Sequence, residues 1–291
     1  MQKNANLKKL TGILKYPLTA LLLYMVLSRL DYRAVKSIII NLEPGLIYIL
    51  ICISLLKLFF QYQNWQLFLL FFPDMVISKR ERLLSFFAGT SLRVITPAGV
   101  GVYGRMLMLS MHKRDSFLAI TYEKLIQGWG ILLYAGIAAG IMYPVIPFFL
   151  KYLIPLLFIS LPFLLLMINE KSPLHKYTPQ NRKQLLPACG TQVIINFLTI
   201  LQYYIFIGSF KDFSFLKALS SVPLVQFANL IPVTISGLGL REQIAMHIYP
   251  PLGISKELAI SCSLFVFMIS NLVPALVGLI LIVTMKPGKK N

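Results

Sequence analysis

The sequence has few charged residues, and acidic residues are the scarcest. Only 13% of its 291 residues are charged, with 10 Asp or Glu against 28 Lys or Arg. A soluble domain carries about 25% charged and roughly 45–50% apolar residues, whereas 57% of this chain is hydrophobic and its mean hydropathy is +0.74. The longest stretch without an apolar run, 170–184, is too short for a soluble catalytic domain. The chain is therefore predicted to be a single all-α, polytopic membrane domain over residues 1–291.

The residues of metal, disulfide and catalytic sites are also scarce. The 3 cysteines are an odd number and lie in apolar runs, which is typical of packing residues, and the 3 histidines lack metal-ligand spacing. No G-x-S-x-G, H-E-x-x-H or Walker sequence is present. We therefore expect no metal, no cofactor and no enzymatic activity.

The net charge of +18 has an explanation in a membrane protein, because Lys and Arg hold loops at the cytoplasmic face against anionic lipid. No basic stretch interleaved with aromatic residues lies outside the apolar runs. Nucleic acid is therefore not a predicted partner.

Apolar runs long enough to cross a bilayer dominate the chain. A spanning helix needs about 20 apolar residues. On that measure the sequence predicts six spans, near 10–28, 45–72, 117–142, 152–168, 187–208 and 258–285. Basic residues precede the first span as in a secretory signal, but no small-residue cleavage site follows it, so we expect it to remain uncleaved.

Two further apolar segments, 83–109 and 218–245, are interrupted by proline and glycine. Both residues interrupt helical hydrogen bonding, and the freed backbone groups are tolerated at membrane depth only beside protein or water. We therefore expect two re-entrant or broken helices. The alternative is two ordinary kinked spans with no shared role.

The two broken segments share a motif. The first reads Pro97-Ala-Gly-Val-Gly-Val-Tyr-Gly-Arg105, and the second reads Pro232-Val-Thr-Ile-Ser-Gly-Leu-Gly-Leu-Arg-Glu242. In each, a proline is followed by a Gly-x-Gly pair and then by an arginine. Paired broken helices in corresponding halves are typical of transporters built from inverted repeats. We predict such a repeat, with halves at about 1–142 and 152–285.

Basic residues gather near both predicted cytoplasmic termini and at 79–82, 113–114 and 171–183, whereas the intervening loops hold few. This imbalance predicts that both termini face the cytoplasm and that the protein lies in the cytoplasmic membrane. The two broken segments would then enter from opposite faces.

Charged residues inside apolar segments normally face a bundle interior or water. They are Lys57, Arg93, Arg105, Glu123, Lys124, Arg241 and Glu242. Because arginine grips phosphate through two hydrogen bonds, Arg105 and Arg241 could hold a lipid phosphate. Alternatively, Arg241 neutralises Glu242 or Glu123, and Arg105 extends to the headgroups. For Glu123 and Lys124, an interfacial role is an equal alternative.

The run Gly99-Val-Gly-Val-Tyr-Gly104 formally matches the dinucleotide-binding G-x-G-x-x-G pattern. That pattern functions at a strand-turn-helix junction in a soluble parallel sheet. Here a proline precedes the glycines and a predicted span follows them, so we reject nucleotide binding.

The segment Ile231–Glu242 resembles the signature of the transmembrane domain of lysylphosphatidylglycerol synthetases, which is also found alone in small flippase-like proteins. The segment Thr96–Arg105 is similar to the matching upstream motif. Tyr122-Glu123-Lys124 falls where that family often carries a Glu-Arg pair, with Lys124 in place of the arginine. In addition, Tyr103 precedes Gly104-Arg105, where an acidic residue is common.

This resemblance covers nearly the whole chain and implies a stand-alone member without the soluble aminoacyl-transferase domain. It implies lipid translocation without lipid synthesis. The first hypothesis is thus a flippase for an anionic or aminoacylated phospholipid or a polyprenyl-phosphate lipid. The second is a non-catalytic, lipid-binding membrane subunit of a separate glycosyltransferase or lipid-modifying enzyme. An intramembrane transferase is a third, but no acid-base pair for it is evident.

In the first hypothesis, the predicted partners are membrane lipids, with a separate lipid-modifying enzyme or a second copy of the chain as alternatives. The predicted site has two groups of residues. The headgroup-binding residues are Arg105, Arg241, Glu242 and Glu123. The residues that shape the cavity are Pro97, Gly99, Gly101, Pro232, Gly237 and Gly239.

Overall fold

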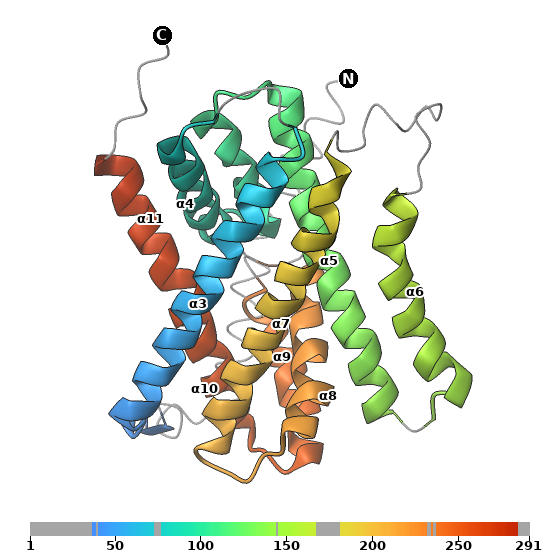
Figure 1. Ribbon diagram of the computed structural model, residues 1–291. Coiled ribbons are helices and arrows are strands. Elements are labelled where there is room, and N and C mark those ends of the chain that lie inside the picture. The colour runs from blue at the N-terminus through green and yellow to red at the C-terminus, as the bar shows by residue number, and fades with distance from the viewer. Residues whose placement is uncertain are drawn as a thin grey trace, which may run out of the picture.

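The computed structural model describes residues 37–38, 40–72, 77–143, 145–166, 181–231, 234 and 237–284. Within these ranges the chain is built from helices, which run roughly along one axis (Figure 1). The predicted all-α membrane bundle is thereby confirmed, and the chain is a multi-pass membrane protein.

Among the described residues, four helical stretches are long and apolar enough to cross a membrane. They are α3 (Pro44–Leu69), α5 (Lys113–Met142), α7 (Leu185–Gly208) with the short 3-10 turn before it, and a continuous stretch formed by α10 (Lys256–Phe267), the π-helix η6 (Met268–Leu272) and α11 (Val273–Thr284). They coincide with four of the predicted spans. The predicted span at 152–168 corresponds to α6 (Phe148–Leu166), a shorter apolar helix containing two prolines, and the one at 10–28 lies outside the described residues.

Large apolar side chains cover much of the outer surface of these helices. Tyr48, Leu55 and Phe59 of α3 are exposed, and so are Tyr152 and Leu156 of α6. Such contiguous apolar exposure is unfavourable in water but favourable in a hydrocarbon phase. The outer face of the bundle therefore suits contact with lipid chains.

Each broken segment folds back on itself instead of crossing the bundle. The first consists of α4 (Lys79–Ile95) and the 3-10 helix η1 (Pro97–Met108), which pack against each other. The second consists of α8 (Phe215–Gln226), the 3-10 turn η4 (Phe227–Leu230) and α9 (Leu240–Ile248). With 17, 12 and 9 residues, α4, α8 and α9 are each shorter than the roughly 20 residues of a span.

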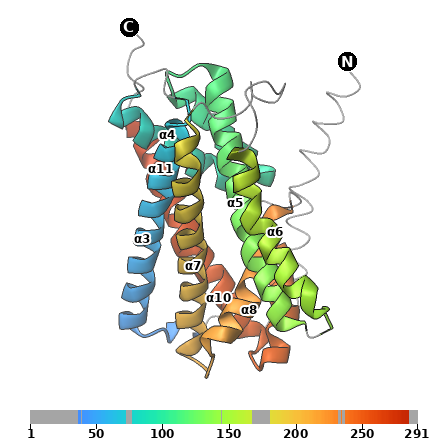
Figure 2. The ribbon, with the colours of Figure 1, turned by 45° about the vertical axis from the view of Figure 1, so that its right-hand side comes forward.

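The two broken segments lie toward opposite ends of the bundle (Figures 1 and 2). The first is at the end where α3 finishes and α5 begins, and the second is at the end where α7 finishes and α10 begins. Serine caps start their leading helices: Ser78 forms a capping box with Glu81, and the Ser214 side chain accepts a hydrogen bond from Lys217 N.

Packing follows the same scheme in both halves. Helix α4 packs on α11, and its counterpart α8 packs on α5. In the first half, η1 and α3 both contact α5. In the second half, their counterparts α9 and α7 both contact α10. The counterparts α3 and α7 pack on each other. This exchange of partners is what an inverted repeat produces, and it agrees with the two short motifs.

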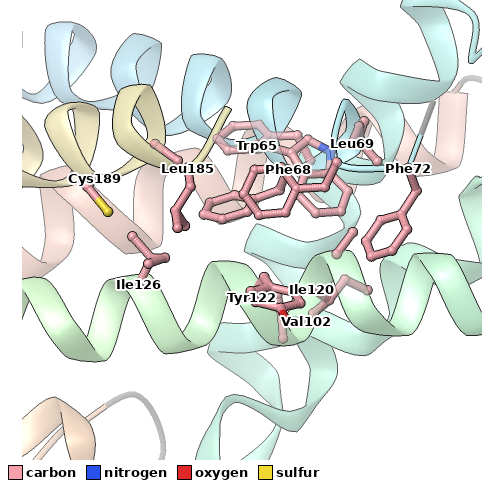
Figure 3. Close-up of a cluster of buried hydrophobic side chains, with 14 of the residues drawn as sticks. Trp65, Phe68, Leu69, Phe72, Val102, Ile120, Tyr122, Ile126, Leu185 and Cys189 are labelled. Atoms are coloured by element: carbon pink, nitrogen blue, oxygen red, sulfur yellow. The ribbon is translucent and has the colours of Figure 1, made fainter. Parts of the chain in front are cut away.

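A dense aromatic cluster closes the end of the bundle that holds α4 and η1. Trp65, Phe68 and Phe72 from the end of α3 meet Val102 of η1 and Ile120 of α5 (Figure 3). Trp65 Nε1 donates a hydrogen bond to Ser85 Oγ on α4 at 3.0 Å, so the indole is satisfied although it is fully buried. This cluster fixes the first broken segment against two spanning helices.

Candidate functional site

A cavity of about 450 Å³ lies among the described helices. Its lining residues come from the middle of α3 (Lys57 and Gln61), of α5 (Lys124–Tyr134) and of α7 (Gln192–Ile200), and from the π-helix region of the α10–α11 stretch. Because α3, α5 and α7 are each long enough to span and contribute residues from their middles, the cavity lies at mid-depth in the bundle. Both broken segments contribute to its wall.

The cavity wall is rich in basic and amide side chains. The basic residues are Lys57, Arg93, Lys124 and Arg241, and the amides are Gln61, Gln127, Gln192, Asn196, Gln226, Asn229 and Asn271. No Asp or Glu is among the described residues that line it. A site of this composition attracts an anion and disfavours a cation.

Lys57 is buried on α3 and connects to a polar network between helices. Its Nζ donates to Gln202 Oε1 on α7 at 3.4 Å. Gln202 Nε2 in turn donates to Ser54 Oγ at 2.7 Å and to Ser270 Oγ at 3.1 Å. This network holds the lysine in place, and no carboxylate in the described part of the chain forms an ion pair with it.

Arg93 and Lys124 are two further basic residues of the cavity wall. Arg93 Nη2 donates to Asn271 Oδ1 at 2.6 Å, and Lys124 Nζ donates to Gln127 Oε1 at 3.1 Å. Arg93 is close enough to both Lys57 and Lys124 for their charges to interact. The basic residues therefore form one cluster of like charges.

The π-helix η6 supplies partners to two of these basic residues. Its Asn271 accepts from Arg93, and its Ser270 belongs to the network that holds Lys57. A π-turn inserts an extra residue into an α-helix and redirects the side chains beside it, which is why such turns are frequent at functional sites.

Arg241, a predicted site residue, borders the cavity and is paired. Its Nη2 lies 2.9 Å from Glu242 Oε1, and its Nε donates to Ser263 Oγ on α10 at 2.8 Å. Glu242 is fully buried, and its other oxygen accepts from Gly239 N at 2.7 Å at the start of α9. Of the pairings left open by the sequence, Arg241 has the one with Glu242.

Arg105 and Glu123, also predicted site residues, lie behind the cavity wall. They form a buried ion pair between η1 and α5, and neither lines the cavity. The Arg105 guanidinium carbon is 4.3 Å from the centroid of the Trp65 ring. Arg105 is thus buried within the bundle, and its predicted contact with phosphate stays a prediction.

The predicted cavity-shaping residues fall in different places. Gly237 lines the cavity with φ +78°, and Gly239 precedes α9 with φ +83°, a backbone region that favours glycine. A side chain at Gly101 would overlap the Leu92 carbonyl, so this glycine allows η1 to approach α4 closely. Pro97 and Gly99 belong to η1, and Pro232 lies outside the described residues.

Sequence reasoning did not select the amides Gln192, Asn196 and Asn271 as site residues. A signal was present, because polar residues in an otherwise apolar spanning helix usually face the bundle interior. Gln192 and Asn196 are four residues apart on α7 and therefore share one face. Lys57, Arg93 and Lys124 were recognised as buried charges, but their convergence depends on the tertiary fold.

Comparison with known families gives one match. A family model described as the lysylphosphatidylglycerol synthase TM region matches residues 12–278. This range covers both broken segments and every residue that lines the cavity. No curated protein matches the chain.

Proposed function

The chain belongs to the lysylphosphatidylglycerol synthase transmembrane-region family, and from this premise we propose that it is a flippase. Membership of this family supports a function related to membrane lipids. The substrate class is an anionic or aminoacylated phospholipid or a polyprenyl-phosphate lipid, moved across the cytoplasmic membrane. The observation that carries the proposal is the basic, amide-lined cavity at mid-depth between two broken segments.

A lipid crosses a bilayer slowly because its polar headgroup must leave water. A polar cavity at mid-depth lowers this barrier by offering hydrogen bonds to the headgroup, while the acyl or prenyl chains stay in the hydrocarbon. The cavity volume of about 450 Å³ falls within the range of about 300–1,000 Å³ typical of ligand pockets. It suits a headgroup better than a whole lipid.

The inverted arrangement of the broken segments supports a transport role. Transporters with such repeats bind the substrate where discontinuous helices converge and open alternately to either side. Here Arg93 and Tyr103 come from the first broken segment, and Asn229 and Arg241 come from the second. One headgroup could therefore contact elements from both ends of the bundle.

The test is transbilayer movement of fluorescent phospholipids and polyprenyl phosphates in liposomes that contain the purified protein. The informative variant is Arg241→Gln combined with Glu242→Gln. It removes a cavity arginine without leaving a buried carboxylate unpaired, which would itself be strongly destabilising. Movement is expected to slow about tenfold or more, as for the loss of one charged hydrogen bond.

The matched control is Lys217→Gln, which removes an exposed lysine near the start of α8. Its rate should equal that of the unmodified protein. Absence of movement for every lipid, with and without ion gradients, would contradict the proposal and favour a lipid-binding subunit of another enzyme.

A further inference from the structure

The charges around the cavity do not balance. Five basic side chains, Lys57, Arg93, Arg105, Lys124 and Arg241, are grouped with two carboxylates, Glu123 and Glu242. Both carboxylates are engaged, Glu123 by Arg105 and Glu242 by Arg241. The described part of the site therefore has three more basic than acidic groups. Like charges at mid-depth are costly, and a bound anion relieves the cost.

The cavity wall also offers more unused hydrogen-bond donors than acceptors. The amide oxygens of five lining residues already accept hydrogen bonds within the protein: Gln127, Gln192, Asn196, Gln226 and Asn271. Each of these oxygens therefore has at most one lone pair left for a ligand ammonium group. The ammonium groups of Lys57 and Lys124, in contrast, have three donors each, and each donates one hydrogen bond within the described part of the chain.

Two buried donors at the cavity have no partner among the described residues. They are the Thr234 hydroxyl, whose residue is 2% exposed, and the amide nitrogen of Asn196. A buried polar group without a partner is energetically unfavourable, so such groups are normally satisfied by a ligand or water. Thr234 belongs to the second broken segment and Asn196 to α7, which places unused donors on two sides of the cavity.

A phosphomonoester supplies what this wall lacks. At neutral pH it carries about 1.5 to 2 negative charges and three acceptor oxygens, and a diphosphate carries more charge, whereas a phosphodiester carries one charge. A lysylated phosphodiester has two ammonium groups and a net positive charge. The cavity would have to accept these ammonium groups beside four basic residues, with no Asp or Glu among the described residues of its lining.

We propose that the cavity selects lipids whose headgroup is a terminal phosphate or diphosphate and discriminates against aminoacylated phospholipids. This inference rests on the proposed function in so far as the bound lipid is moved across the membrane. The selectivity of binding can be measured separately. Lys57, Arg93 and Lys124 provide the charge, and Thr234 and Asn196 provide neutral donors. The ligand chemistry is that of a phosphomonoester, whether on a lipid or as free phosphate.

The experiment is competition for a fluorescent phosphatidic acid bound to the purified full chain in nanodiscs. The competitors are phosphatidic acid, phosphatidylglycerol and lysylphosphatidylglycerol with identical acyl chains, and inorganic phosphate. Phosphatidic acid should compete about tenfold better than phosphatidylglycerol, and lysylphosphatidylglycerol should be the weakest lipid. Equal competition by the three lipids, or preference for the lysylated one, would overturn the proposal.

Variants connect this selectivity to the cavity. Lys57→Gln should lower the affinity for phosphatidic acid about tenfold, Lys57→Arg should restore most of it, and Lys217→Gln should leave it unchanged. Gln192→Glu adds a carboxylate to the wall. It should reduce the ratio of the affinity for phosphatidic acid to the affinity for lysylphosphatidylglycerol. Thermal unfolding of each variant shows that it is folded, and a folded Lys57→Gln protein with unchanged affinity would contradict the assignment.

Three further outcomes separate the lipid assignment, the headgroup selectivity and the flippase function. If inorganic phosphate competes as well as phosphatidic acid, the site is one for free phosphate and the lipid assignment is wrong. If phosphatidic acid is preferred but no lipid moves in liposomes, the selectivity stands and the proposed flippase function fails. If lipids move without any headgroup preference, the function stands and the selectivity fails.

Discussion

The two broken segments carry the same motif but use its arginine differently. In the first, Arg105 pairs with Glu123, which lies 18 residues further along on the spanning helix α5. In the second, Arg241 pairs with its neighbour Glu242, and the following span contributes the hydroxyl of Ser263. The first pair thus joins two elements by a buried ion pair, whereas the second is local and joins α9 to α10 through hydrogen bonds.

The two arginines therefore differ in their surroundings: one is enclosed by other side chains, and the other borders the cavity. Arg105 is enclosed by the aromatic cluster and lies behind the wall, while Arg241 borders the cavity. The arginine of two similar motifs is therefore enclosed by protein in one half and borders the cavity in the other. The mutations below test whether the two halves depend on their arginines to different extents.

The largest effect is expected from Glu123→Gln. It leaves Arg105 buried with an uncompensated charge, and such a loss costs about 3–5 kcal/mol in unfolding free energy. Thermal unfolding in detergent, followed by tryptophan fluorescence, measures it. The double change Arg105→Met with Glu123→Leu removes both charges and should be less destabilising than Glu123→Gln alone. Equal stability of Glu123→Gln and the unmodified protein would show that the pair does not anchor η1.

A smaller effect is expected from Gly89→Ala. A methyl group there would overlap the Arg105 side chain, so the arginine or α4 must shift, at a cost of about 1–3 kcal/mol. The control is Gly190→Ala on α7, where no described heavy atom lies within 4 Å of the added methyl group. Higher helix propensity should make that variant slightly more stable, by up to about 1 kcal/mol. Similar unfolding temperatures for the two variants would contradict the close approach of Gly89 and Arg105.

The smallest effect is expected from Ser263→Ala in the second half. The Ser263 hydroxyl accepts from Arg241 Nε and donates to Glu242 Oε1, both at 2.8 Å, and its loss should cost about 1–2 kcal/mol. Ser160→Ala is the control, since within the described ranges that hydroxyl donates to the Leu157 carbonyl of its own helix and to no other group. A loss from Ser263→Ala as large as that from Glu123→Gln would remove the contrast between the halves.

The sequence predicts much of the fold because hydrophobic length is a local property. The apolar runs at 45–72, 117–142, 187–208 and 258–285 correspond to spanning helices, since unpaired backbone groups in hydrocarbon leave few alternatives to a helix. The proline and glycine interruptions predicted the two broken segments for the same reason. The motif shared by Pro97–Arg105 and Pro232–Glu242 also predicted the inverted arrangement.

Only the tertiary structure decided which charges face the cavity. The sequence identifies Arg105 and Arg241 as equivalent, yet their positions differ because a carboxylate on α5 reaches the first and a hydroxyl on α10 reaches the second. Convergence of Lys57, Arg93 and Lys124 depends on how α3, α4 and α5 pack, and the spacing of these residues does not encode it. Helix formation follows from local hydrogen bonding and burial in lipid, whereas the site arises from contacts between residues far apart in the chain.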